Sequence, residues 1–256
     1  MYTMFIECNL KYNFMALVFK EVAAVKTIGM LGGMSWESTL SYYRIINEGI
    51  KESLGGLHSA KIVLYSVDFA EIEALQHQGD WEKTAEILGG AAQSVERAGA
   101  DFLIICTNTM HKVFPVVEKA VGIPIIHIAD ATAHVLQKNY IHRAGLLGTR
   151  FTMEQPFYRG RLEENFNIEV LVPDEAGRSV VHEIIYRELC TGQINQDSKE
   201  RFLSIIEGLR DQGAEAVILG CTEISLLVQQ SDTDVLLYDT TALHAAKAVE
   251  LALWEA

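Results

Sequence analysis

The chain has 256 residues, of which 49% are apolar and 21% are charged, and its formal net charge at pH 7 is −13. This composition is typical of a globular protein and excludes a disordered chain, a collagen-like repeat and a coiled coil. An acidic surface repels phosphate backbones and anionic membranes, so we expect neither a nucleic-acid nor a membrane partner. The four cysteines, at positions 8, 106, 190 and 221, are too scattered for a disulfide framework and favour a cytoplasmic location.

Residues 1–25 differ from the rest of the chain. No positive charge precedes Lys11, and the apolar run at 14–19 is short, which is unlike a secretory signal. We interpret 1–25 as an N-terminal extension, so that the organised part begins at Lys26.

The first half of the remaining chain alternates between strand and helix patterns. We predict strands at 26–33, 61–67, 102–106 and 124–128, and helices at 37–51, 81–98 and 130–138. Strands that alternate with helices predict a parallel sheet covered on both faces.

The same order of elements then repeats. We predict strands at 142–149, 169–172 and 216–219 and helices at 151–165 and 198–212, while 235–242 echoes 125–132. The fold class is therefore α/β, with a first lobe at 26–137, a second pseudo-symmetric lobe at 138–256, and a terminal helix that is able to pack back on the first lobe. Because ligands of such sheets bind beyond the carboxyl ends of the strands, we expect the site in the cleft between the lobes.

Two matching strands end in small protic residues. When the halves are aligned on Gly99 and Gly213, Cys221 falls on Thr107 and not on Cys106. Side chains alternate along a strand, so if Thr107 faces the cleft, Cys106 faces the packed interior. Two protic groups across a substrate suit a reaction that removes a proton from one face and returns one to the other.

Three motifs carry a resemblance to a known family. They are Leu-Gly-Gly-Met-Ser-Trp-Glu-Ser-Thr at 31–39, Asn-Thr-Met-His at 108–111 and Gly-Cys-Thr-Glu at 220–223. With these motifs the sequence resembles the cofactor-independent aspartate/glutamate racemases, and the resemblance extends from Lys26 to the C-terminus. It implies racemisation of aspartate, glutamate or both by one catalytic cysteine from each lobe, with no pyridoxal phosphate and no metal. The chain also has no sequence motif for a metal site.

The sequence departs from the family at one catalytic position. Cys221 occupies the second cysteine position, whereas Thr107 stands in place of the first. A thiol can become a thiolate in a polar, helix-capped site, but an unassisted hydroxyl is a poor base near pH 7. By analogy with the family we expect Cys221 to act on the L-enantiomer and Thr107, or water held by it, to protonate the opposite face.

The other expected site residues bind the substrate. Backbone amides at helix N-termini can hold a carboxylate, and Glu223 can bind the α-ammonium group. The full set of expected substrate-binding residues is Met34, Ser35, Gln76, Asn108, Thr109, Thr149, Thr222 and Glu223. We expect Cys106 and Cys190 to lie outside the site, and we regard His111 as a residue that can tune it. A homodimer is a further expectation, which rests on the family alone.

Two alternatives stay open. A single cysteine in the second half is also found in decarboxylases of substituted malonates and in related isomerases of small diacids. The chain could also be a non-catalytic amino-acid-binding protein that lost turnover with its first cysteine. Solvent deuterium at Cα, release of carbon dioxide, or neither would distinguish the three.

Overall fold

The computed structural model describes residues 25–254 and contains two parallel four-stranded sheets. The first sheet has the strand order β2-β1-β3-β4 and consists of β1 (Ile28–Gly32), β2 (Ile62–Ser66), β3 (Phe102–Ile105) and β4 (Ile125–Ile126). The second has the order β6-β5-β7-β8 and consists of β5 (Arg143–Gly148), β6 (Glu169–Leu171), β7 (Ala216–Gly220) and β8 (Leu236–Asp239). The predicted α/β class with two parallel-sheet lobes is confirmed. The N-terminal extension falls outside the described residues, apart from Val25.

The strands β3 and β7 begin with the same hydrogen-bonding pattern in the two sheets. The strand β3 begins with the amide of Asp101 bonded to the carbonyl of Thr27 at 2.9 Å, and β7 begins with the amide of Glu215 bonded to the carbonyl of Arg143, also at 2.9 Å. Each of these two acids also accepts hydrogen bonds from backbone amides at the start of the neighbouring strand. The preceding glycines have φ values of 93° and 98°, a left-handed conformation that glycine adopts readily. The ungapped alignment of the halves therefore matches equivalent positions in space.

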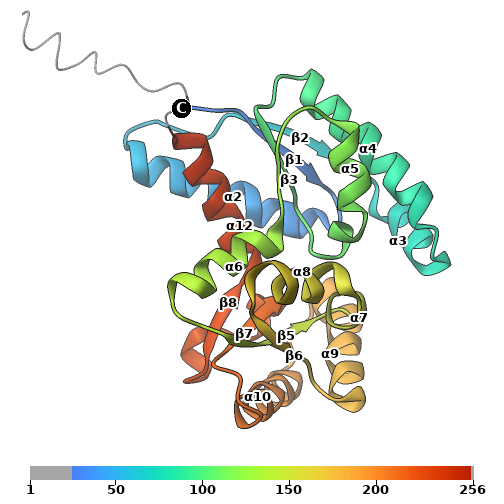
Figure 1. The fold of residues 1–256 in the computed structure, drawn as a ribbon, viewed down its shortest axis with the longest axis vertical. Helices are drawn as coiled ribbons and strands as arrows, with labels where there is room; N and C mark the ends of the chain where they lie inside the picture. Colours follow the sequence, from blue (N-terminus) through green and yellow to red (C-terminus); the bar gives the residue numbers. More distant parts are fainter. Residues whose placement is uncertain (1–24, 255–256) are drawn as a thin grey trace, which may run out of the picture.

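Helices cover both faces of the first sheet (Figure 1). They are α2 (Trp36–Leu54), α3 (Phe69–Gln78), α4 (Trp81–Arg97), η1 (Thr109–Val113), α5 (Phe114–Ala120) and, from the end of the chain, α12 (Thr240–Leu253). On one face Leu31 and Leu103 pack in a cluster with Leu88 of α4, and on the other face Met30 packs in a cluster with Tyr42 of α2. Because both faces are buried, the strands are almost entirely apolar, as is usual for parallel sheets.

The second sheet is covered by a longer series of helices. They are α6 (Ile128–Lys138), α7 (Arg150–Glu154), α8 (Pro156–Phe166), α9 (Glu175–Arg187), η2 (Leu189–Thr191), α10 (Gln196–Asp211), α11 (Ile224–Leu227) and η3 (Gln230–Asp232). The last helix leaves the second sheet and lies along α2 of the first lobe (Figure 1). There the hydroxyl of Tyr42 donates to Nδ1 of His244 at 2.9 Å, and the amide of Lys26 donates to the carbonyl of Ala252 at 3.0 Å.

Several elements differ from the sequence prediction. The helices α3 and α9 were not predicted, and they begin at Asp68 and Asp174, whose carboxylates accept backbone amides of the first turn. The single helix predicted at 151–165 is two helices, because Gln155 is extended and the next residue, Pro156, begins α8. The strand predicted at 124–128 is limited to β4, because α6 already begins at Ile128.

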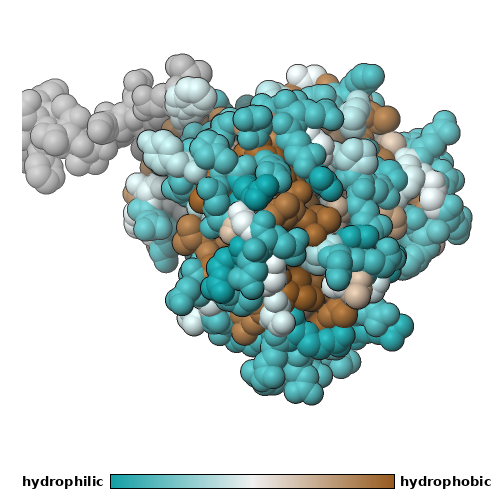
Figure 2. Space-filling view, turned by 60° about the horizontal axis from the view of Figure 1, so that its bottom comes forward, coloured by the Kyte–Doolittle hydropathy of each residue, from teal (hydrophilic) through white to brown (hydrophobic). Residues whose placement is uncertain are grey.

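Within residues 25–254 no helix is both long and apolar enough to span a bilayer. One face of the molecule is mostly hydrophilic and has apolar surface gathered around its middle (Figure 2).

Candidate active site

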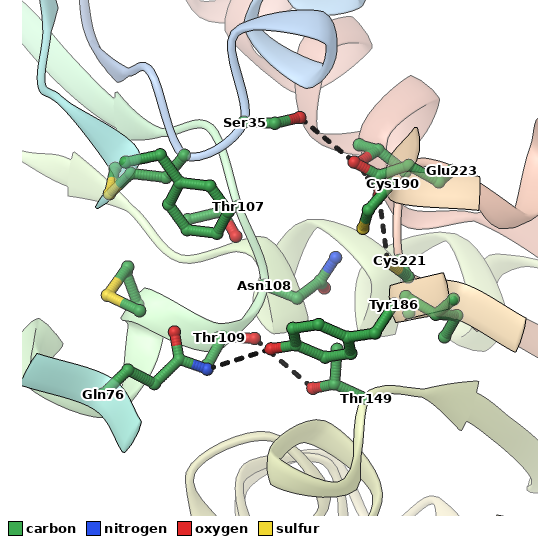
Figure 3. A pocket seen from close by; sticks show the side chains of 16 residues that line it. Ser35, Gln76, Thr107, Asn108, Thr109, Thr149, Tyr186, Cys190, Cys221 and Glu223 are labelled. Atoms are coloured by element: carbon green, nitrogen blue, oxygen red, sulfur yellow. Dashed lines mark hydrogen bonds between the residues drawn. The ribbon is translucent and has the colours of Figure 1, made fainter. Parts of the chain in front are cut away.

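A pocket of about 550 Å³ lies between the lobes, beyond the carboxyl ends of the central strands β1, β3, β5 and β7 (Figure 3). All ten predicted site residues line it: Met34, Ser35, Gln76, Thr107, Asn108, Thr109, Thr149, Cys221, Thr222 and Glu223. Phe69, Met110, Ile185, Tyr186, Cys190 and Gly220 line it as well. Thr107 and Cys221 come from opposite lobes and lie on opposite sides of the pocket, with Asn108 between them (Figure 3).

The turn after β1 brings Ser35 to the pocket. Gly33 has φ = 90°, and a Cβ at this position would collide with the backbone of Val67, so the tight turn requires glycine. Its amide donates to the hydroxyl of Thr39 at 2.8 Å, which ties the turn to α2. Ser35 caps that helix, accepting the amide of Ser38 at 3.3 Å, and its own hydroxyl is directed to the second lobe.

The turn after β3 is held by a buried histidine. Nε2 of His111 accepts the amide of Ile128 at 3.1 Å, so its Nδ1 carries the proton and donates to the carbonyl of Thr107 at 2.9 Å. Burial lowers the pKa of His111 to about 4, so the ring is neutral at physiological pH. His111 therefore positions the Thr107 turn and does not line the pocket.

The side chain of Asn108 is fixed by the second lobe. Its Nδ2 donates to the hydroxyl of Thr240 at 3.0 Å, and that hydroxyl donates to the carbonyl of Leu219 at 3.0 Å. Oδ1 of Asn108 is buried and has no hydrogen-bond partner among the described residues. Because an unpaired buried acceptor is costly, this oxygen is suited to accept a hydrogen bond from a ligand.

The carboxylate of Glu223 collects three hydrogen bonds. The thiol of Cys221 donates to Oε2 at 3.0 Å, the hydroxyl of Thr222 donates to the same oxygen at 2.7 Å, and the hydroxyl of Ser35 donates to Oε1 at 3.1 Å (Figure 3). Glu223 is only 8% exposed. It therefore joins Cys221 of the second lobe to Ser35, the helix cap of the first.

Two further contacts connect the lobes at the pocket. The hydroxyls of Thr109 and Thr149 lie 3.4 Å apart, and Nε2 of Gln76 donates to the hydroxyl of Tyr186 at 3.3 Å (Figure 3). Both are long hydrogen bonds, which are weak and can be broken when the lobes separate.

The surroundings of Cys221 favour its thiol form in the free protein. Burial, and then the charge of Glu223, raise the pKa of this thiol well above its usual range. A desolvated thiol beside a carboxylate stays protonated. In the free protein Cys221 is thus a hydrogen-bond donor to Glu223.

Of the other two described cysteines, one lies in the core and the other lines the pocket. Cys106 is fully buried against α2 and α12, as predicted from strand alternation. Cys190 was expected outside the site, and this is wrong: the turn η2 directs it into the pocket beside Glu223 and Cys221 (Figure 3). Cys190 as a whole is exposed to solvent, but partial desolvation of its thiol, followed by the charges of Glu223 and Glu37, raises its pKa to about 12.

The residues that sequence analysis missed come mostly from elements that it missed. Phe69 is the first residue of α3, while Ile185 and Tyr186 lie at the end of α9. Burial and the neighbouring thiols of Cys221 and Cys190 raise the pKa of Tyr186 to about 12, so it is a neutral hydroxyl. The signals were present, since an Asp at the start and a Gly or Arg near the end mark each helix.

The pocket suits proton transfer at a small zwitterion. Backbone amides of the turns after β1, β3 and β7 can bind a carboxylate, and Glu223 and Oδ1 of Asn108 offer acceptors for an ammonium group. Among residues 25–254, His, Cys, Asp and Glu form no group of three or more placed to hold a metal ion.

Comparisons with known proteins agree with this geometry. The family described as Asp/Glu/Hydantoin racemase matches residues 31–248. A crystal structure of a candidate Asp/Glu racemase from Yersinia pestis is 54% identical, with a TM-score of 0.86 over 90% of this chain and 100% of that one. The crystal structure of an aspartate racemase homologue from Pyrococcus horikoshii OT3 is 37% identical, with a TM-score of 0.79 over 89% and 99%. A broad specificity amino-acid racemase, RacX of Bacillus subtilis (strain 168), is 21% identical over 88% of this chain and 98% of its own length. The chain belongs to the Asp/Glu/Hydantoin racemase family.

Proposed function

We propose that this amino-acid racemase interconverts the enantiomers of acidic amino acids, aspartate, glutamate or both, without a cofactor, and that Cys221 and Thr107 serve the two faces of Cα. The observation that carries the proposal is the placement of these two protic side chains, from matching strand ends, on opposite sides of one pocket (Figure 3). A two-base reaction requires this arrangement, because the proton leaves from one face and returns to the other.

The proposed reaction from the L-enantiomer has two proton transfers. The Cys221 thiolate takes the proton from Cα, and the electron pair left on carbon spreads into the α-carboxylate. Backbone amides of the strand-end turns stabilise that developing charge. The hydroxyl of Thr107, or a water that it holds, then gives a proton to the opposite face and regains one from solvent.

The Thr107 side is the weaker half of this pair. A threonine hydroxyl is a poor base near neutral pH, so removal of the proton from the D-enantiomer is slow. After deprotonation of the L-enantiomer, return of a proton from Cys221 competes with delivery from the Thr107 side. We therefore expect L-substrate in heavy water to exchange its α-proton faster than it inverts.

The lining of the pocket favours a second candidate substrate class. Among the lining residues that the structure describes, Glu223 is the one side chain with a formal charge, and the hydroxyls of Thr109, Thr149 and Tyr186 provide neutral polar contacts. A second carboxylate on the substrate is best held by Arg or Lys. Amino acids with a neutral polar side chain, such as a hydroxyl or an amide, are therefore the alternative to aspartate and glutamate.

The test is proton exchange in heavy water with purified protein. Aspartate, glutamate, serine, homoserine, asparagine and glutamine are incubated as single enantiomers, and deuterium at Cα and chirality are measured by mass spectrometry and chiral chromatography. We expect labelled and inverted amino acid, and the ranking of rates identifies the substrate class. Release of carbon dioxide from substituted malonates without labelling of any amino acid would instead establish the decarboxylase alternative, and binding without either reaction would establish the non-catalytic one.

A further inference from the structure

The hydrogen bond between Cys221 and Glu223 presents a problem for a base. The thiol donates to Oε2 at 3.0 Å, and the carboxylate that receives it is buried at 8% exposure. A negative charge at this distance opposes loss of the thiol proton, because a thiolate would face a carboxylate in a poorly solvated pocket.

The pocket contains two hydrogen-bond acceptors, on Glu223 and Asn108, that suit the ammonium group of an amino acid. Oδ1 of Asn108 is buried and unpartnered among the described residues, and its orientation is fixed because Nδ2 is bonded to Thr240. Glu223 and Asn108 both line the pocket, and the carboxylate of the first and the amide oxygen of the second are hydrogen-bond acceptors. An ammonium group has three donors and a positive charge, which match a carboxylate and a neutral acceptor.

We propose that the α-ammonium group of a bound amino acid replaces the Cys221 thiol as the partner of Glu223, so that the base is formed only in the presence of substrate. In the free protein, the thiol is held protonated by the carboxylate. In the complex, the ammonium group neutralises Glu223, the thiol proton leaves to solvent, and the thiolate faces Cα. The inference rests on the proposed function for the identity of the ligand, but not for the coupling between Glu223 and Cys221.

The other titratable groups around the Cys221 thiol do not control its protonation. Cys190 from η2 and Tyr186 from α9 face Cys221, and both are neutral because desolvation raises the pKa of each to about 12. Glu37 of α2 faces Cys190 and is exposed to solvent, which screens its charge. Glu223 is thus the charged group in direct contact with Cys221 in the described part of the chain.

The decisive variant is Glu223→Gln, which keeps a side chain of the same size and removes its charge. We expect alkylation of Cys221 by iodoacetamide in the free protein to become about tenfold faster at pH 7, since one pKa unit changes the thiolate fraction tenfold. The pH profile of alkylation should shift to lower pH. Turnover should change in the opposite direction, with kcat/KM reduced at least about tenfold, chiefly through KM, because the ammonium group loses an ionic partner. The modified peptide is identified by mass spectrometry, which separates Cys221 from Cys190.

Two control variants make the result specific. Glu37→Gln removes a nearby exposed charge and should leave the alkylation profile of Cys221 unchanged. Glu223→Asp keeps the charge, so the pH profile of its alkylation should stay close to that of the unmodified protein. If alkylation and turnover both fall in Glu223→Gln, Glu223 is instead the base that activates the thiol, and if the profile does not move, the carboxylate does not control Cys221. Should the unmodified protein racemise no amino acid, the proposed function fails, whereas the alkylation experiment still decides the coupling.

Discussion

At the scale of single residues, Cys221 and Cys106 carry the same thiol in opposite surroundings. Cys221 lines the pocket, whereas Cys106 is fully buried in the cluster between the first sheet and α2. We expect Cys221→Ser to lower kcat by about 10²- to 10⁴-fold, the usual contribution of a general base, while amino-acid binding persists. Racemisation rate and ligand-induced shift in Tm measure the two effects.

Cys106→Ala is the matched control for that variant. It removes a buried sulfur, so it should cost about 1 kcal/mol or more of stability, as small core deletions do, and leave kcat largely unchanged. Loss of activity in Cys106→Ala as deep as in Cys221→Ser, with the circular dichroism spectrum intact, would show that Cys106 contributes to the reaction in spite of its buried position.

Thr107 allows the asymmetry of the site to be tested by restoring a thiol. The equilibrium constant between free enantiomers is one, so any variant must change kcat/KM by the same factor in both directions. We expect Thr107→Cys to raise kcat/KM by about tenfold or more in both directions, and kcat more from the D-enantiomer, because a thiol is the better base. Thr107→Ser keeps the hydroxyl and should stay close to the original rates. A fall in both directions for Thr107→Cys would point to another proton donor on this face.

The residues of the site were predictable where a motif carried them. Thr107, Cys221 and Glu223 stand in short blocks at strand ends, where the chain has little freedom to direct them elsewhere. Cys190 and Tyr186 were not predictable in the same way, since they reach the pocket through the path of α9 and η2 around the second sheet. That path depends on tertiary packing, which no local pattern encodes.

At the scale of elements, three buried histidines join α6, η1 and α12 below the pocket. The ring centroids of His111 and His127 are 4.5 Å apart and those of His111 and His244 are 5.8 Å apart. Burial lowers the pKa of His111 to about 4 and that of His244 to about 3, and it lowers the pKa of His127 as well. All three are neutral in the folded state, because burial removes the water that would stabilise their protonated forms.

This cluster predicts a loss of stability in acid. Each imidazole binds a proton near pH 6.5 in the unfolded chain but only at lower pH in the folded one, so its contribution is complete above about pH 6.5. As the pH falls from about 6.5 toward the folded pKa values, each group should lower the free energy of unfolding by about 1.4 kcal/mol per pH unit. Urea unfolding at pH 7.5, 6.0 and 5.0 measures the slope.

A pair of variants tests this assignment. His244→Asn removes one of the buried imidazoles, so it should lower stability at pH 7.5 and also make the slope shallower by about one proton. The exposed His58, changed to Asn, should leave the slope as it is. An unchanged slope in His244→Asn would assign the acid sensitivity to other groups.

Elements were predicted well where burial imposes a pattern. Apart from Arg143 at the start of β5, the central strands are apolar because both faces of each sheet are covered, and this distinguishes their sequences clearly from those of the helices. The helix α3 buries only Ile72 and Gln76, so its apolar periodicity is weak and its capping residues are its main signal. The helix α9 buries Val181, Ile184 and Ile185 at helical spacing, a pattern that the prediction overlooked.

At the scale of the whole molecule, the bond between Gln76 and Tyr186 joins α3 of the first lobe to α9 of the second. We expect Tyr186→Phe to raise KM by a few fold with a smaller change in kcat, because the variant loses one weak hydrogen bond that holds the lobes together over the substrate. Tyr140→Phe, at a position 81% exposed, is the control and should leave both constants unchanged. Equal KM values in all three proteins would show that this bond does not contribute to closure.

The chain of hydrogen bonds from Asn108 through Thr240 to Leu219 has a mechanical consequence. It ties Asn108, the residue after Thr107, to β7, which ends at Gly220 just before Cys221, and α12 and α6 connect the lobes beside it (Figure 1). The lobes are thus held together firmly on this side. On the other side, α3 and α9 are joined by the long hydrogen bond between Gln76 and Tyr186. We expect the lobes to rotate apart about a hinge at Asn108, so that the pocket opens between α3 and α9. The distance between Thr107 and Cys221, which lie next to the hinge, should stay constant. Spin labels on α3 and α9 should therefore report a broad, ligand-sensitive distance distribution, and labels on α2 and α12 a narrow one.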